Sequence, residues 1–154
     1  TSESMAKIKI VYGSGSGNTE LVCEKVSELL KEKGHEVFLL KAKLTEPKDM
    51  GAYDLLILAC PTYGNGELEQ YFGKFLGQMA SEDLSGKSCS VIGLGDAKYD
   101  RDYHLESIKI ISDFLNKKHA KLIGMPLRIS KCPLPLMNGH VDRWAMKIDE
   151  LLRA

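Results

Sequence analysis

The sequence predicts an α/β fold, a doubly wound three-layer sandwich in which helices cover both faces of a five-stranded parallel sheet. Strand-like apolar runs alternate with segments of helical periodicity along the chain, as expected for right-handed βαβ units. Residues 55–60 are almost wholly apolar, which is typical of a parallel strand covered on both faces. The 154 residues suffice for one domain, assigned to residues 5–154. Residues 1–4 precede Met5 and are interpreted as a cloning remnant.

The first half of the chain predicts three strands and one helix. Residues 8–12 form the first apolar run, and a helix is expected from Thr19, where apolar residues recur at helical spacing until Gly34 provides the stop. Residues 37–40 are the second strand, and residues 55–60 the third.

The second half predicts a helix over residues 70–79, a strand over 88–94 and a helix with an apolar face from Leu105 to Leu115. Residues 122–129 are expected as one continuous fifth strand, with Pro126 suggesting an edge or a bulge. A final helix is expected over 141–152.

Composition excludes several classes of protein. The hydrophobic fraction is 44%, yet no run approaches the roughly 18 apolar residues of a membrane span, and the N-terminus lacks the features of a signal peptide. The four cysteines are widely spaced, so neither zinc nor a disulfide framework is predicted, and a cytoplasmic location is expected. No metal site is predicted, and the scattered histidines are expected at the surface rather than in catalysis: His35, His104, His119 and His140.

The net charge of zero conceals a division along the chain. Residues 62–106 carry eight acids against four bases, whereas residues 107–135 carry six bases against Asp113 alone. This asymmetry could steer a charged partner, or it could reflect solvated helix faces. Both interpretations remain open.

A glycine-rich loop at residues 13–19 joins the first strand to its helix. Free backbone N–H groups and the helix dipole at such a junction favour an anion, and glycines let the backbone curl around it. The loop holds no lysine or arginine, so neutral groups would bind the anion. The candidate side-chain donors are Ser14, Ser16, Asn18 and Thr19.

Three other interpretations apply to a glycine-rich loop at this position. A Walker A loop needs Lys-Ser/Thr after its last glycine, where Asn18 and Thr19 stand. A dinucleotide fingerprint needs a glycine at position 18 and an acid after the second strand, where the chain has Lys41 and Lys43. A Gly/Ser turn that binds nothing remains the third.

The pattern Ile10-Val11-Tyr12-x-Ser14-x-x-Gly17-x-Thr19 resembles the flavodoxin signature for the 5′-phosphate of FMN. Cys23 departs from the family's usual alanine. The resemblance extends over residues 7–153 and is closest to short-chain flavodoxins. It implies the flavodoxin-like strand order 2-1-3-4-5. It also implies a phosphate grip by Ser14, Gly15, Ser16, Gly17, Asn18 and Thr19.

Two further loops extend the resemblance to the flavin ring. In the loop that starts at Pro61, the likeness implies that Tyr63 stacks on the flavin, that Thr62 meets the ribityl chain and that the Asn65 N–H reaches O4. The Gly64 carbonyl would flip toward N5–H in the semiquinone, which glycine permits at low steric cost.

The third loop follows the fourth strand. Its run Gly93-x-Gly95-Asp96-x-x-Tyr99 resembles the family's loop whose tyrosine, here Tyr99, stacks on the outer flavin face. Backbone groups would meet the pyrimidine edge, from Asp96, Arg101 and Tyr103. Taken alone, either aromatic loop is more often an ordinary surface turn.

The resemblance implies a one-electron carrier with FMN as its cofactor and no catalytic residues of its own. Expected partners are redox proteins, a flavodoxin-reductase-type donor and an acceptor enzyme, docking at the flavin edge of a monomer. Neither a nucleic acid nor a membrane is expected. The neutral charge departs from the acidic short-chain type. Alternatives are an FMN-dependent NAD(P)H/quinone oxidoreductase and a phospho-receiver, which would need an acidic pair where Gly13-Ser14 stands.

Overall fold

A computed structural model describes residues 6–13, 17–61, 68–95, 106–129, 135 and 137–153. Its parallel strands lie in the order β2-β1-β3-β4-β5, which confirms the predicted doubly wound sheet. The strands are β1 (Lys7–Tyr12), β2 (Glu36–Lys41), β3 (Leu55–Pro61), β4 (Ser88–Leu94), β5 (Lys121–Leu122) and β6 (Leu127–Ile129).

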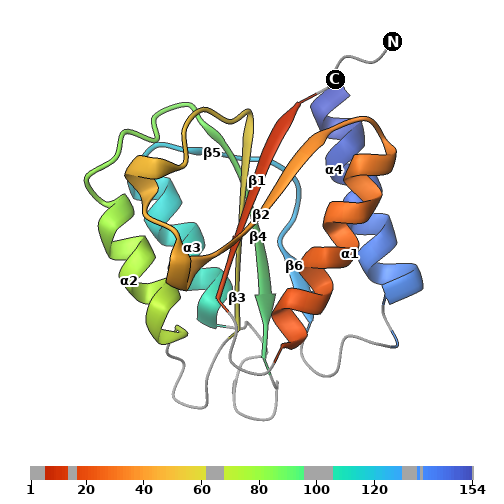
Figure 1. Ribbon diagram of the computed structural model, residues 1–154, viewed down its shortest axis with the longest axis horizontal. Coiled ribbons are helices and arrows are strands. Elements are labelled where there is room, and N and C mark those ends of the chain that lie inside the picture. Colours follow the sequence, from red (N-terminus) through yellow and green to blue (C-terminus); the bar gives the residue numbers. More distant parts are fainter. Residues whose placement is uncertain are drawn as a thin grey trace.

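Within the described part of the chain, four α-helices form the outer layers. They are α1 (Asn18–Glu32), α2 (Gln70–Met79), α3 (Glu106–Lys117) and α4 (Asp142–Arg153), the last preceded by a π-helical turn at Met137–Val141. Helices α1 and α4 cover one face of the sheet, and α2 and α3 cover the other (Figure 1). Two short 3₁₀ helices, Ala42–Leu44 and Pro47–Asp49, follow β2 and lie against α2.

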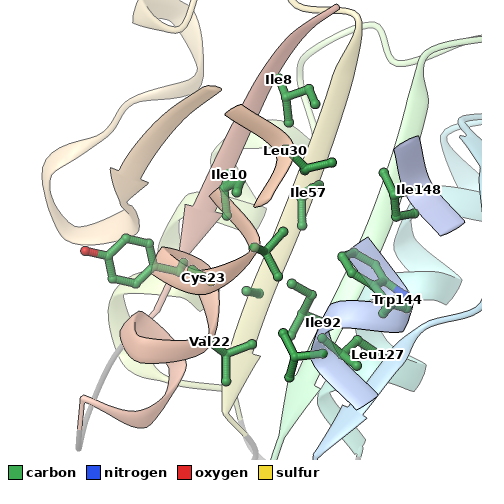
Figure 2. Close-up of a cluster of buried hydrophobic side chains, with 14 of the residues drawn as sticks. Ile8, Ile10, Val22, Cys23, Leu30, Ile57, Ile92, Leu127, Trp144 and Ile148 are labelled. Carbon is green, nitrogen blue, oxygen red and sulfur yellow. The ribbon is translucent and has the colours of Figure 1, made fainter. Parts of the chain in front are cut away.

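The core consists of two layers because the residues of each strand point alternately to opposite faces. Within β3, Ile57 belongs to the cluster beneath α1 and α4, whereas Leu56 and Leu58 belong to the cluster beneath α2 and α3. All three are fully buried. Figure 2 shows the first cluster, in which Ile57 lies among side chains from β1, α1 and α4.

The prediction of one continuous fifth strand over residues 122–129 was wrong. The edge strand is in two pieces, since β5 pairs with Ser88 and Cys89 of β4, while β6 pairs with β4 from Ile92 onward. Gly124 between them has a left-handed φ of 71°, and Pro126 has no N–H to donate to a ladder. The edge position that Pro126 suggested is confirmed, and residues 123–126 separate the two pieces.

Two side-chain hydrogen bonds stabilise the segment between β5 and β6. The Ser90 hydroxyl donates to the Ile123 carbonyl at 2.9 Å, and the Trp144 indole N–H donates to the Met125 carbonyl at 2.6 Å. Both bonds satisfy carbonyl groups that a regular ladder would have used.

Three cysteines, Cys23, Cys60 and Cys89, are free and buried, whereas Cys132 lies outside the described residues. Burial raises the pKa of the Cys60 and Cys89 thiols to about 12. At neutral pH these thiols are protonated and therefore poor nucleophiles. They act as packing residues of the core.

Within the described ranges, no helix combines the length and the apolar character needed to cross a membrane. Nor do three or more His, Cys, Asp or Glu side chains of these residues gather where they could hold a metal ion.

One histidine lies where the sequence did not place it. His35 is only 4% exposed and faces α4, so its expected surface position was wrong. His119 and His140 are exposed as predicted, and His104 lies outside the described residues.

Candidate functional site

The carboxyl ends of β1, β3 and β4 lie side by side at one end of the sheet, the lower end in Figure 1. Tyr12 of β1 is in register with Ala59 of β3, and Pro61 of β3 is in register with Leu94 of β4. The three loops singled out in the sequence leave from these ends. In doubly wound folds this is the edge at which ligands bind.

The N-terminus of α1 is set up to receive an anion. Gly17 precedes the helix in a left-handed conformation with a φ of 88°, and its carbonyl accepts from the Leu21 N–H at 3.0 Å. Gly17 has no side chain, and no side chain of the described residues caps the helix at Gly17, so backbone N–H groups of the first turn can donate to a ligand. Asn18 is exposed in this turn, whereas Thr19 is only 2% exposed.

A hydrogen bond fastens this first turn to the end of β1. The Tyr12 hydroxyl donates to Glu20 Oε1 at 2.9 Å. Burial and the neighbouring Glu20 raise the pKa of Tyr12, so the hydroxyl stays protonated and keeps donating. Glu20 is the acidic residue of the first turn of α1, and this bond fixes its carboxylate against Tyr12.

The start of α2 is held by a residue that the sequence analysis missed. Glu69 is 6% exposed, and its carboxylate accepts from the backbone N–H of Tyr71 at 3.1 Å and of Phe72 at 2.7 Å. It therefore caps α2, a role more usual for Ser, Thr, Asp or Asn. Its position directly before the predicted helix was the only signal available.

Glu69 also packs against the end of β1. A Cβ added to Gly13 would lie 2.7 Å from Glu69 Oε2 and 2.9 Å from Phe72 Cβ. The Gly13 N–H donates to the Ala59 carbonyl of β3 at 2.9 Å. Gly13 thus lets the first loop start in close contact with both β3 and α2.

Pro61 and Gly95 mark where the other two loops depart. Pro61 is the last residue of β3, and its carbonyl accepts from the Cys60 thiol at 3.3 Å. The Gly95 N–H donates to the Ile129 carbonyl of β6 at 3.0 Å. The structure therefore brings Gly17, Pro61 and Gly95 to the same end of the sheet.

The remaining predicted site residues lie outside the described residues, so the structure does not test them. They are Ser14, Gly15, Ser16, Thr62, Tyr63, Gly64, Asn65, Asp96, Tyr99, Arg101 and Tyr103.

Fold and site together define a class: a doubly wound α/β protein whose first helix can receive an anionic ligand without a cationic side chain from the described part of its loop. The family model for flavodoxin matches residues 10–151. The chain is 36% identical to the flavodoxin of Maridesulfovibrio salexigens, covering 84% of this chain and 89% of the relative. It is 32% identical to flavodoxin 1 of Azotobacter vinelandii, covering 78% of this chain and 70% of that relative.

Solved flavodoxin structures are also similar to this chain. Oxidised flavodoxin 2 from Bacillus cereus superposes with a TM-score of 0.86 at 32% identity, over 94% of this chain and 99% of that one. A Fusobacterium nucleatum flavodoxin bound to flavin mononucleotide shares the fold, with a TM-score of 0.76 at 20% identity. The match covers 94% of this chain and 98% of that one. The chain belongs to the flavodoxin family.

Proposed function

We propose that this protein binds FMN non-covalently and carries single electrons between redox partner proteins. The observation that carries the proposal is the left-handed Gly17 at the start of α1, beside the carboxyl ends of β1 and β3, in a chain of the flavodoxin family. When bound, FMN supplies the one-electron redox chemistry, and the protein supplies binding, orientation and electrostatics.

The residues that are described fit the phosphate end of FMN. The first-turn N–H groups of α1 and the helix dipole stabilise a phosphate dianion. The Thr19 side chain is buried at this point, where its hydroxyl is protected from competing water. With these we assign Ser14, Ser16 and Asn18 to the phosphate, as the family resemblance implies.

We assign the flavin ring to the loops that leave β3 and β4. Tyr63 and Tyr99 would stack on its two faces, and backbone groups at Gly64, Asn65 and Asp96 would contact its polar edge. Support comes from the adjacent positions of Pro61 and Gly95, from which these two loops start.

We further propose that the protein acts as a cytoplasmic monomer and turns over no substrate of its own. The free, buried thiols of Cys23, Cys60 and Cys89 suit a reducing compartment. Its partners would be a flavodoxin-reductase-type donor and an acceptor enzyme that approach the flavin edge.

Addition of FMN to the purified chain is expected to give a stoichiometric complex with flavin absorption bands. Stepwise reduction is then expected to proceed through a one-electron-reduced form, because the proposed carrier transfers single electrons. Absorbance during an anaerobic reductive titration measures both results. Failure to bind FMN would refute the proposal, and direct hydride uptake from NADPH without a reductase would favour a quinone oxidoreductase instead.

Substitution Thr19→Val is expected to weaken FMN binding about tenfold or more, because a hydrogen bond to a charged group contributes about 1.5–3 kcal/mol. Riboflavin has no phosphate, so its affinity should change less than about twofold. Fluorescence titration of both ligands measures the difference. Ser27→Ala is the matched control, since Ser27 is also buried in α1 but two turns further on. Equal losses for FMN and riboflavin would contradict the assignment of Thr19 to the phosphate.

A further inference from the structure

Residues of α2 and of the two 3₁₀ helices that follow β2 line a groove. Figure 1 shows α2 beside the segment that holds these 3₁₀ helices. Its volume is about 720 Å³, with Lys9 and Leu40 among the strand residues that line it. This volume is within the range of about 300–1,000 Å³ that ligand-binding clefts occupy. Of the flavin-site residues assigned above, none that the structure describes lines it.

The groove carries an excess of positive charge. Lys9, Lys43 and Lys74 line it, and none of them belongs to an ion pair among the described residues. Against these three lysines, the described lining has two carboxylates, those of Glu46 and Asp49. Glu46 Oε2 lies 3.4 Å from Lys48 Nζ and is paired with it.

Aromatic rings hold two of these lysines. Lys43 Nζ lies 5.1 Å from the centre of the Tyr71 ring, and Lys9 Nζ lies 5.3 Å from that of Phe38. Such cation–π contacts keep the ammonium groups in place while leaving their N–H donors for a ligand.

The groove also has an apolar rim. Leu44 of the first 3₁₀ helix is 79% exposed, and Tyr71 of α2 is 38% exposed. These two exposed side chains offer apolar contact surface to a protein segment that lies in the groove.

A second hollow extends the groove toward the flavin site. Its volume is about 260 Å³, and it shares Lys43 and Tyr71 with the groove. It continues to Tyr12, Lys41 and Glu69, at the ends of β1 and β2 and the start of α2. A chain bound along both hollows would therefore reach the end of the sheet where FMN is proposed to bind.

We infer that this groove docks a carboxylate-rich segment of a redox partner protein and so positions the partner beside the flavin. The lysines attract the carboxylates and speed the encounter, while Leu44 and Tyr71 contact apolar residues of the segment. The inference rests on the proposed function for the identity of the partner, but the acidic segment is recognised by the groove itself.

The probe is a short, capped, rhodamine-labelled peptide rich in glutamate with one leucine, titrated against the FMN-loaded protein. Fluorescence anisotropy at about 20 mM salt should show binding that is lost as salt shortens the Debye length. The double substitution Lys43→Glu and Lys74→Glu should weaken binding about tenfold or more. The same peptide with glutamine in place of glutamate should bind no better to the wild type than to this variant.

The matched control reverses Lys31 and Lys117, exposed in the last turns of α1 and α3. It changes net charge by the same amount and should alter peptide affinity less than about twofold. Equal loss in both variants, or no binding by the wild type, would overturn the inference. Tighter binding of a labelled oligothymidylate would also overturn it, in favour of a nucleic acid. Flavin absorbance is read separately, so a failure to bind FMN tests the proposed function and not the groove.

Discussion

Substitution Gly93→Ala is expected to destabilise the protein by about 3 kcal/mol, because it overpacks the contact between β4 and α3. A Cβ at Gly93 would overlap Cγ1 of Ile108 and would lie 2.7 Å from its Cδ1 and 3.1 Å from Ser107 Oγ. Ile108 is only 3% exposed, so its side chain cannot turn into solvent. Urea unfolding followed by circular dichroism measures the loss.

Gly73→Ala is the control for the alanine substitution itself. Gly73 is inside α2, and a Cβ there would meet nothing within 4 Å. This variant should be stabilised by up to about 1 kcal/mol, since alanine favours the helix. Combining Gly93→Ala with Ile108→Ala should cost at least about 1 kcal/mol less than the two single losses together. Strict additivity would show that the overlap with Ile108 is not the cause.

The second large effect is expected at the buried pair formed by His35 and Asp149. His35 Nε2 lies 2.8 Å from Asp149 Oδ1, and Arg153 Nε donates to both oxygens of Asp149 at 2.9 and 3.0 Å. Arg153 also donates to the Lys33 carbonyl at 2.8 Å, so the network ties α4 to the turn between α1 and β2. Asp149→Asn should cost about 2–3 kcal/mol at neutral pH, because the buried His35 and the guanidinium of Arg153 lose a charged acceptor.

This stabilisation should depend on pH in a defined direction. Burial alone would raise the pKa of Asp149, but the hydrogen bonds from Arg153 and His35 outweigh it and hold this pKa below its ordinary value of 3.8. A lowered folded-state pKa contributes stability above the unfolded value, and this contribution disappears as pH falls through the folded pKa. The difference in free energy of unfolding between wild type and Asp149→Asn should therefore be constant above about pH 5 and shrink below about pH 4.

Urea unfolding across this pH range measures the effect. Asp113→Asn is the control, since Asp113 pairs with Lys109 at 3.3 Å on an exposed face of α3. An exposed pair of this kind should contribute less than about 0.5 kcal/mol. A difference for Asp149→Asn that persists unchanged to low pH would show that ionisation of Asp149 is not its source.

Local signals in the sequence were sufficient for most of the fold. The unbroken apolar run of β3 predicted a doubly covered strand, and helical spacing predicted α2 with its observed bounds, Gln70–Met79. These signals lie within one element, where the hydrophobic period reflects which faces are covered. The same signals failed at residues 122–129, because an apolar composition does not reveal that Gly124 and Pro126 interrupt the pairing with β4.

The candidate site was predicted unevenly. The glycine-rich loop and its helix predicted an anion site at α1, and the structure places Gly17 in the left-handed conformation that such a junction needs. Glu69 was missed because glutamate is an uncommon helix cap and its contact with Gly13 joins segments far apart in sequence. The stacking of Tyr63 and Tyr99 on the two faces of the flavin stays a prediction.

By itself the sequence determined the alternation of strands and helices, the neutral first loop and the likeness to flavodoxins, since each is written in neighbouring residues. Only the tertiary structure decided which distant groups meet. It buried His35 against Asp149, 114 residues along the chain, seated Ile108 over Gly93 and opened the lysine-lined groove beside α2. Such contacts depend on the packing of the helices on the sheet, which periodicity within one segment does not encode.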